Sequence, residues 1–240
     1  MTIERQPGML INCAVNQVAL SFFVTNEADL IQRHHASGLF YETEELAIIA
    51  RHFPAGGTFL DVGANVGNHA IYVAKFLRPH RVIVIEPNPT AIIVLRTNIK
   101  LNALTSIVDE THLGIGLSDR AGHGSLTVQE NNLGGARLSL APSPQATIPV
   151  IRGDALLADQ RIDFIKLDVE GMELAALDGL TDTIGRCRPA IFAEIEDRNR
   201  QGFETWLERL GYQVSEGHRR YAWNENLLVT PKEGQQNSEA

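Results

Sequence analysis

The chain has 240 residues, of which 44% are hydrophobic and 21% charged, a composition typical of a folded globular protein. This length suits one domain with a sizeable core. Acidic residues outnumber basic residues by 29 to 21, which gives a formal net charge of −8. Because nucleic-acid binding calls for a basic surface, we expect no nucleic-acid partner.

Cysteine usage and hydropathy argue against two further classes of protein: those held together by disulfides or cysteine-bound metals, and those that cross a membrane. Cys13 and Cys187 form neither a disulfide framework nor a metal-ligand pattern. No apolar stretch reaches the roughly 18 residues needed to cross a membrane. Residues 9–24 are apolar but contain three interrupting polar residues, with no basic segment before them. We therefore expect no membrane partner and a cytoplasmic protein.

The N-terminal region predicts a small extension. Residues 1–25 contain β-rich pieces that suggest an antiparallel strand pair, residues 27–36 a short helix, and residues 40–49 an amphipathic helix. We expect residues 1–50 to form an extension or cap, residues 51–231 the main domain, and the polar residues 232–240 a disordered tail.

Strands and helices then alternate, which predicts an α/β, doubly wound, mostly parallel sheet with helices on both faces. In such a sheet the carboxyl ends of the strands meet at one edge, where ligands bind. Strands are expected near 58–62, 82–86, 111–116, 162–168, 189–195, 212–214 and 226–229, and helices near 68–77, 89–101, 171–178 and 201–210.

Residues 122–150 interrupt the alternation and predict a β-hairpin insertion. A long insertion at the ligand-binding edge suggests a cap over the substrate. A hairpin that simply faces solvent explains the same residues equally well.

The first central strand runs into Asp61 and then into a glycine-containing turn at Gly63 and Gly67, followed by a helix. Glycines allow sharp turns close to a ligand, and the helix N-terminus offers free N–H groups. Asn65 and Asn68 stand where the dinucleotide fingerprint requires glycine, and Asp61 would repel a pyrophosphate. S-adenosylmethionine, with an ammonium and a single carboxylate, suits this loop better.

The second strand ends at Glu86, 19 residues after Gly67. An acid at this position is suited to bind both ribose hydroxyls of a nucleoside. Asn88 is expected to contact the adenosine edge. Asp119 suits the adenine amino group, although a surface turn explains it equally well.

The fourth strand ends in a group of charged residues, Lys166, Asp168 and Glu170, which alternation places on one side. The two acids suit three roles: a general base, ligands of a divalent cation, or groups that orient substrate hydroxyls. Acids stabilised by a helix N-terminus are the structural alternative. For Lys166 a structural ion pair is the favoured interpretation.

Other polar residues are weaker candidates. Glu194 and Glu196 end the next strand and are second choices for substrate or metal contacts, with solvated charge as the favoured explanation. Asp154 suits a helix cap or a pocket acid, and His218 is a minor candidate for a base. No histidine pair has metal-ligand spacing, so no residue is assigned as a metal ligand.

Several segments resemble the FkbM family of S-adenosylmethionine-dependent methyltransferases. The most specific is the Lys-x-Asp-x-Glu-Gly segment, and the others are residues 37–42, 61–69, 86–87 and 131–137. The resemblance implies a seven-stranded class I methyltransferase fold whose last strand is antiparallel. It also implies methyl transfer, typically to a hydroxyl of a sugar, polyketide or other natural product, and in some relatives to nitrogen, including in peptides.

By position, the resemblance implies cofactor contacts at Asp61, Gly63, Asn65, Gly67 and Glu86, with Tyr41 and Glu42 closing over the methionine end; Asn68, which opens the helix, completes the expected set. We predict O-methylation of a small hydroxylated acceptor, with Asp168 as base or substrate anchor and Glu170 in support. N-methylation of a peptide is the nearest alternative. A nicotinamide-dependent oxidoreductase and a catalytically silent binding domain are more distant ones. The acceptor, a divalent cation as cofactor, and the oligomeric state stay open.

Overall fold

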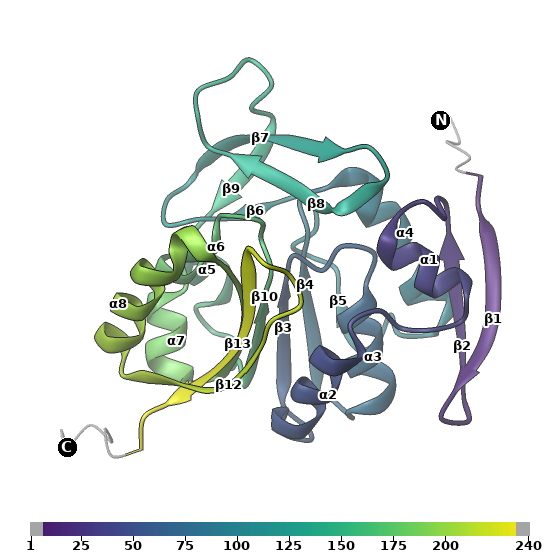
Figure 1. The fold of residues 1–240 in the computed structure, drawn as a ribbon, viewed down its shortest axis with the longest axis horizontal. Helices are drawn as coiled ribbons and strands as arrows, with labels where there is room; N and C mark the ends of the chain where they lie inside the picture. The colour runs from purple at the N-terminus through teal and green to yellow at the C-terminus, as the bar shows by residue number, and fades with distance from the viewer. Residues whose placement is uncertain (1–6, 234–240) are drawn as a thin grey trace.

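The structure is a computed structural model that describes residues 7–233. Its centre is a seven-stranded sheet in which the last strand is antiparallel to both of its neighbours (Figure 1). The strand order is β12 (Tyr212–His218), β13 (Asn224–Pro231), β11 (Ala190–Glu196), β10 (Phe164–Leu167), β3 (Thr58–Val62), β4 (Arg81–Ile85) and β5 (Val108–Asp109). The expected sheet and its reversed last strand are confirmed.

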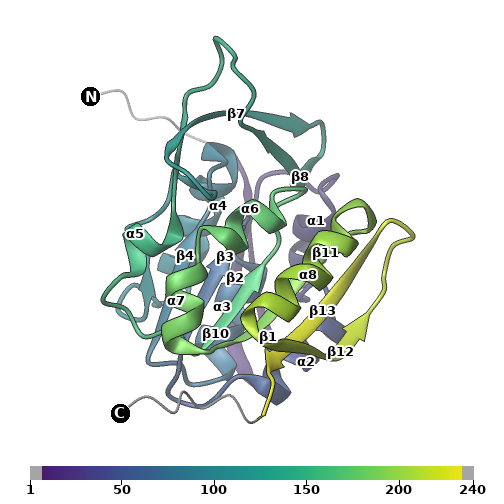
Figure 2. The ribbon, with the colours of Figure 1, turned by 90° about the vertical axis from the view of Figure 1, so that its left-hand side faces the viewer.

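Helices cover both faces of this sheet (Figure 2) because its central strands are apolar on both sides. Every residue of β3 and β10 is buried. Phe59 belongs to the core under one layer of helices, whereas its neighbour Leu60 belongs to the core under the other. The first layer is α2 (Thr43–His52), α3 (Asn68–Phe76) and α4 (Pro89–Leu101); the second is α5 (Gly153–Leu157), α6 (Glu173–Asp178), α7 (Thr181–Cys187) and α8 (Arg200–Leu210).

The N-terminal extension is part of the same core. The predicted strand pair and short helix are present as β1 (Met9–Val15), β2 (Val18–Val24) and α1 (Leu30–Ala36). Two buried asparagines, Asn98 in α4 and Asn102 at its C-terminal cap, attach β2. Asn102 exchanges two hydrogen bonds with the backbone of Ser21, at 3.0 and 2.7 Å, and Asn98 accepts one from Phe23 N–H at 2.7 Å. Amide side chains thereby satisfy strand groups that have no neighbouring strand.

The predicted insertion forms a second sheet above the carboxyl ends of the central strands (Figure 1). It contains β6 (Gly116–Leu117), β9 (Ile148–Ile151), β7 (Gly122–Gln129) and β8 (Asn132–Ser139), in that order. Asp29 joins this sheet to the N-terminal region, because its carboxylate caps α1 at Gln32 N–H and accepts from Leu133 N–H at 2.8 Å. The hairpin is therefore held in place over the sheet edge.

One expected strand is misplaced, and one short helix was not expected. The third strand is not at 111–116 but at β5, where Val108 pairs with Val82. The chain leaves the central sheet directly after Asp109, whose carboxylate accepts from Thr111 N–H at 3.0 Å and closes an Asx turn. Helix α7 was not expected, because it is one of the shortest helices and contains Gly185.

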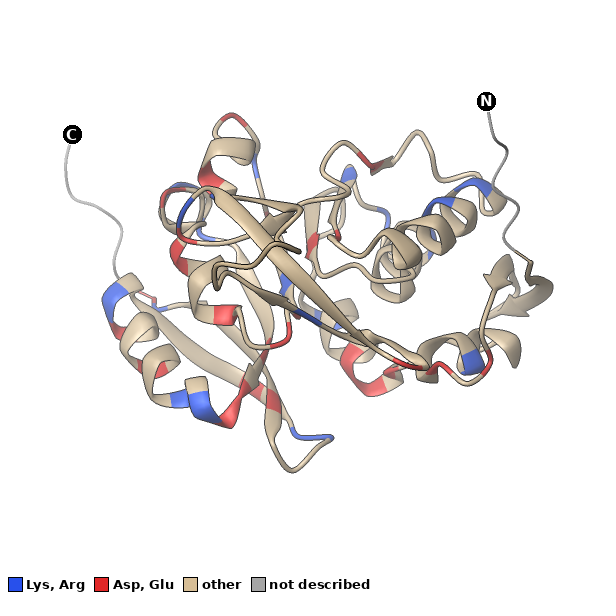
Figure 3. Cartoon of the chain, turned by 90° about the horizontal axis from the view of Figure 1, so that it is seen from above, with Lys and Arg blue, Asp and Glu red and all other residues tan. Residues whose placement is uncertain are grey.

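Charge and the chain ends complete the description. The expected disordered tail, 232–240, lies outside the described residues apart from Lys232 and Glu233. Within residues 7–233, no helix is both long and apolar enough to cross a bilayer. Figure 3 shows acidic and basic segments interspersed over the molecule, so the net negative charge is not gathered in one region.

Candidate functional site

Two adjoining cavities open at the carboxyl ends of β3, β4 and β10. The strand-end cavity has a volume of about 560 Å³ and lies between these ends and the insertion sheet. The acidic cavity, about 880 Å³, continues towards the N-terminal region and the β12–β13 turn. Both are lined by Gly63, Asn65, Gly134, Asp168 and Glu170. The two cavities therefore form one continuous site.

The predicted glycine loop forms the boundary between the cavities, although its glycines serve packing. Gly63 has φ +82°, and a Cβ there would lie 1.8 Å from the carbonyl oxygen of Asp168. Gly67, at φ +95°, lines neither cavity. A Cβ added at Gly67 would lie 2.7 Å from the side chain of Leu95. Asn65 lines both cavities in a left-handed conformation, φ 48°. Its buried side-chain oxygen has no hydrogen-bond partner among the described residues.

Glu86 lies at the mouth of the strand-end cavity, as expected for a residue that binds a ribose. One carboxylate oxygen accepts from Asn65 N–H at 2.8 Å, and the other accepts from Asn88 N–H at 2.8 Å. Each oxygen keeps a second lone pair for a ligand. Burial raises the pKa of Glu86 to about 7 despite these two backbone donors.

Asp61 lies beneath the loop and not in the site. It is fully buried and lines neither cavity, so the expected direct contact with the cofactor has no counterpart in the cavity walls. Burial raises the pKa of Asp61. The Lys166 ammonium lies 3.6 Å from Asp61, 3.4 Å from Asp168 and 2.9 Å from the Gly63 carbonyl oxygen. The structural ion pair expected for Lys166 is confirmed.

Lys166 keeps its charge inside this cluster. Burial alone would lower its pKa, but Asp168 and Asp61 outweigh that effect and raise the pKa above its usual range. Lys166 thereby joins the loop, the end of β10 and the floor of the acidic cavity.

Asn68 holds the segment that carries Tyr41. Its amide donates to the Tyr41 carbonyl and accepts from the Tyr41 N–H, both at 2.9 Å. Glu42 follows in a left-handed conformation, φ 58°, and its carboxylate lies 3.5 Å from the ring nitrogen of His69. Burial, reinforced by Asp168, raises the pKa of Glu42 to about 8, and burial lowers the pKa of His69. Tyr41, Glu42, Asn68 and His69 all line the acidic cavity. Of these four residues, the sequence did not predict His69 as a contact.

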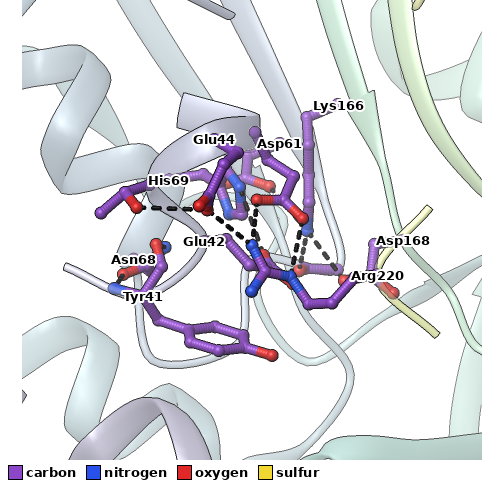
Figure 4. A network of polar contacts seen from close by, with 12 residues as sticks. Tyr41, Glu42, Glu44, Asp61, Asn68, His69, Lys166, Asp168 and Arg220 are labelled. Carbon is purple, nitrogen blue, oxygen red and sulfur yellow. Dashed lines mark hydrogen bonds and ion pairs between the residues drawn. The ribbon is translucent and has the colours of Figure 1, made fainter. Parts of the chain in front are cut away.

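The turn between β12 and β13 closes this end of the site (Figure 4). Arg220 donates to Glu44 at 2.9 Å and twice to the buried Glu45, at 2.6 and 2.9 Å, and its guanidinium lies 5.5 Å from the ring centre of Tyr41. The hydroxyls of Tyr41 and Tyr221 are 2.7 Å apart. Residues from the two ends of the chain are thus fastened together across the cavity.

Three carboxylates gather on the opposite wall. Asp168, Glu170 and Glu194 place oxygens within 4.8 Å of one another. Arg137 lies 3.4 Å from Glu170, and the Asn224 amide donates to Glu194 at 2.6 Å. Burial and then Asp168 raise the pKa of both glutamates, that of Glu170 to about 7 and that of Glu194 to about 9.

Five other candidates lie outside both cavities. Asn88 is buried and caps α4 by accepting from Thr90 N–H, and Asp119 is exposed and hydrogen-bonded to Ser118, so neither contact predicted with the adenosine edge is supported. Asp154 caps α7 instead of its own helix. Glu196 is ion-paired with Arg137 and Arg198. His218 lies 3.6 Å from Glu45, behind the turn.

Several lining residues gave no usable signal in the sequence. They are Leu30, Ile31, Tyr221, Trp223 and Asn224. Each comes from a segment that reaches the cavity only through tertiary contacts.

The residues present fit S-adenosylmethionine. The strand-end cavity combines apolar side chains, such as Ile85, Leu117 and Met172, with the Glu86 carboxylate, which suits an adenosine. The buried side-chain oxygen of Asn65, which lines both cavities, has no hydrogen-bond partner among the described residues and is free to accept from a ligand group such as an ammonium. For a divalent cation the structure offers no comparable support, because Lys166 and Arg137 already supply positive charge to Asp168 and Glu170.

Comparison with known proteins supports this assignment. The model of the methyltransferase FkbM domain matches residues 61–214. The methyltransferase sdnD of Sordaria araneosa is 24% identical over 215 residues, covering 75% of this chain and 82% of that protein. A methyltransferase FkbM structure from Methylobacillus flagellatus KT has a TM-score of 0.58 at 18% identity and covers 83% of this chain; the chain spans about half of that protein, 52%.

The TYW2 structure of M. jannaschii in complex with AdoMet also has the same fold, with a TM-score of 0.52 at 16% identity over 96% of this chain and 90% of that one. The family match begins at Asp61 and contains the glycine loop, Glu86 and the Lys166–Glu170 segment. This family match excludes the two more distant alternatives, a nicotinamide-dependent oxidoreductase and a catalytically silent binding domain. The chain belongs to the FkbM family and is an S-adenosylmethionine-dependent methyltransferase.

Proposed function

We propose that the protein methylates a hydroxyl group of a sugar or of another small natural product. The observation that carries this proposal is the wall shared by the two cavities. Asp168 and Glu170 line both the strand-end cavity, which suits the adenosine, and the acidic cavity next to it. An acceptor in the acidic cavity would therefore lie beside the donor and beside carboxylates.

The residues of this wall suit the limited demands of the reaction. S-adenosylmethionine supplies an already activated methyl group, so the protein must align the acceptor, exclude water and remove one proton. Asp168 is the base that we favour, because its side chain lines both cavities and the Lys166 ammonium, 3.4 Å away, holds it in place. Glu170 lies beside it, held in a left-handed conformation with φ 48°.

The mouth of the acidic cavity favours an acceptor with a ring. The side chains of Tyr221 and Trp223 stack there, with ring centres 5.0 Å apart and planes inclined by 16°. Trp223 is 60% exposed, which is unusual for a large aromatic side chain. An exposed aromatic face together with nearby carboxylates suits a sugar, which offers a face of C–H groups and a rim of hydroxyls.

N-methylation of a peptide or amide side chain is the alternative within the same chemistry. The excess of carboxylates favours the amine of a peptide as the nitrogen acceptor, because an acidic cavity attracts a cationic amine but not a neutral amide. However, an ammonium group has no lone pair for the methyl group and must lose a proton before it can react. A neutral hydroxyl becomes reactive as its proton passes to Asp168.

Methyl transfer from labelled S-adenosylmethionine to a matched panel tests the proposal. The panel contains methyl glycosides, the corresponding amino sugars and short peptides. We expect label in one or more glycosides, and a loss of at least about 100-fold in Asp168→Asn, the size of a general-base contribution. Asp159→Asn, which changes an exposed acid, is the control and should keep full activity. Transfer only to amino sugars or peptides would contradict the proposal.

A further inference from the structure

Three of the four carboxyl groups of the acidic cavity lie so close together that a charge on all three at once is disfavoured. Asp168, Glu170 and Glu194 place oxygens within 4.8 Å of one another, and all three residues are half-buried. Like charges this close strongly disfavour full ionisation, and such a group holds a proton at neutral pH. The chemistry of the cavity depends on which of the three carboxyls holds it.

The cations near the cluster are unevenly distributed. Asp168 has the Lys166 ammonium at 3.4 Å, and Glu170 has the Arg137 guanidinium at 3.4 Å. Among the described residues, Glu194 has no ion pair, and its hydrogen-bond partner is the neutral amide of Asn224 at 2.6 Å. A buried acid without a cationic partner is the one on which a proton is most stable.

We propose that Glu194 is a specificity-determining residue that holds a proton at neutral pH and presents a hydrogen-bond donor beside Asp168, which accepts. The paired groups match a hydroxyl, which donates one hydrogen bond and accepts others. The hydroxyl proton points to Asp168, and a lone pair of the same oxygen accepts from Glu194. An ammonium group has three donors and no acceptor, so it leaves the Glu194 proton without a partner. This selection of the acceptor rests on the proposed O-methylation, whereas the protonation does not.

The groups around Glu194 favour the protonated form of its side chain. Burial raises its pKa most, and Asp168, Glu42 and Glu170 raise it further, while Lys166 opposes them. A carboxyl whose pKa is higher in the folded protein than in the unfolded chain binds its proton preferentially in the folded state. Its contribution to stability is therefore present below the ordinary value of 4.5 and is lost as the pH rises towards about 9.

The pH dependence of unfolding tests the proton directly, without donor or acceptor. We would measure the unfolding equilibrium constant in urea between about pH 6 and pH 9 for the wild type and for Glu194→Gln, whose amide does not titrate. The unfolding equilibrium constant of the wild type should rise with pH more steeply than that of the variant. The ratio of the two constants should grow by up to about tenfold per pH unit. Glu42, Glu86 and Glu170 titrate in both proteins, so the difference reports Glu194.

A matched control lies two residues further along β11. Glu196 is ion-paired with Arg137 and Arg198, so Glu196→Gln should keep the wild-type slope. Glu194→Ala also removes the titrating group and serves if the Gln variant does not fold. Equal slopes in the wild type and the Glu194 variants would overturn the proposal.

Magnesium chloride provides a second arm at about pH 7. If Glu194 is protonated, the cluster has too little charge for a divalent cation, and the wild-type Tm should not depend on magnesium more than that of Glu194→Gln. A magnesium-dependent rise in Tm that Glu194→Gln abolishes would also overturn the proposal. Neither arm involves methyl transfer, so failure of the proposed O-methylation gives a separate result.

Discussion

The two cavities of the site differ in how they are built. All lining residues of the strand-end cavity lie between Val62 and Met172, and most follow directly from the ends of central strands or from the insertion sheet. The acidic cavity is lined by residues from Leu30 to Asn224, and it contains four carboxylates, one lysine and one histidine. One cavity is thus a product of the sheet, whereas the other is assembled from segments far apart in the chain.

The comparison separates what a fold provides from what a particular chain adds. Parallel strands that end at one edge create a nucleoside cavity in any sheet of this kind. The acceptor side requires residues that the sheet does not place, such as the Tyr41 segment and the turn after β12. We therefore expect substrate choice to depend on the acidic cavity and donor binding to depend on the strand-end cavity.

The largest effect is expected at the loop on which both cavities depend. Gly63→Ala places a methyl group 1.8 Å from the Asp168 carbonyl oxygen and also strains a backbone at φ +82°. We expect a loss of roughly 3–5 kcal/mol in the free energy of unfolding. Urea denaturation followed by circular dichroism measures it.

Gly56→Ala is the matched control for Gly63→Ala. Gly56 has nearly the same backbone, φ +79°, but has no atom within 4 Å of the added methyl group. It should lose only the cost of the left-handed conformation, about 1–2 kcal/mol. If both variants lose the same amount, the close contact at Gly63 has no energetic importance.

An intermediate effect should be confined to the strand-end cavity. Glu86→Gln replaces a carboxylate that faces the ribose site, and we expect S-adenosylhomocysteine to bind roughly 10- to 100-fold more weakly by calorimetry. Because the pKa of Glu86 is raised to about 7, wild-type affinity should fall as the pH drops below that value, whereas the Gln variant should show no such trend. Asp119→Asn, at an exposed position outside both cavities, should bind like the wild type; a matching loss there would break the assignment.

The smallest effect is expected at the turn that closes the acidic cavity. Arg220→Met leaves the buried Glu45 without its guanidinium partner, and because Arg220 is a quarter exposed we expect only about 1–2 kcal/mol of lost stability. Binding of S-adenosylhomocysteine should change by less than about threefold, since the residue is remote from the strand-end cavity. Arg219→Met removes an exposed ion pair with Asp197 and should lose less than about 1 kcal/mol. A large loss of donor affinity in Arg220→Met would show that the two cavities are not separable.

The same division explains what could be predicted from the sequence. The strand, loop and helix around Gly63, the position of Glu86 and the convergence of Asp168 with Glu170 all follow from local pattern and sheet topology. Burial is harder to foresee: Asp61 has the sequence position of a ligand contact, but the loop folds over it and Lys166 neutralises it. Contacts such as Arg220 with Glu45 join residues 175 positions apart and leave no local trace.

The bond between the Tyr41 and Tyr221 hydroxyls connects residues 180 positions apart, and this separation has a consequence for synthesis. In a chain that emerges from the ribosome in order, all the residues that line the strand-end cavity have emerged once residue 172 is exposed, although β11, which pairs with β10, follows later. The acidic cavity stays open until the turn at 221–224 has emerged as well. A nascent chain thus carries every side chain of the strand-end cavity before it carries those that enclose the acidic cavity.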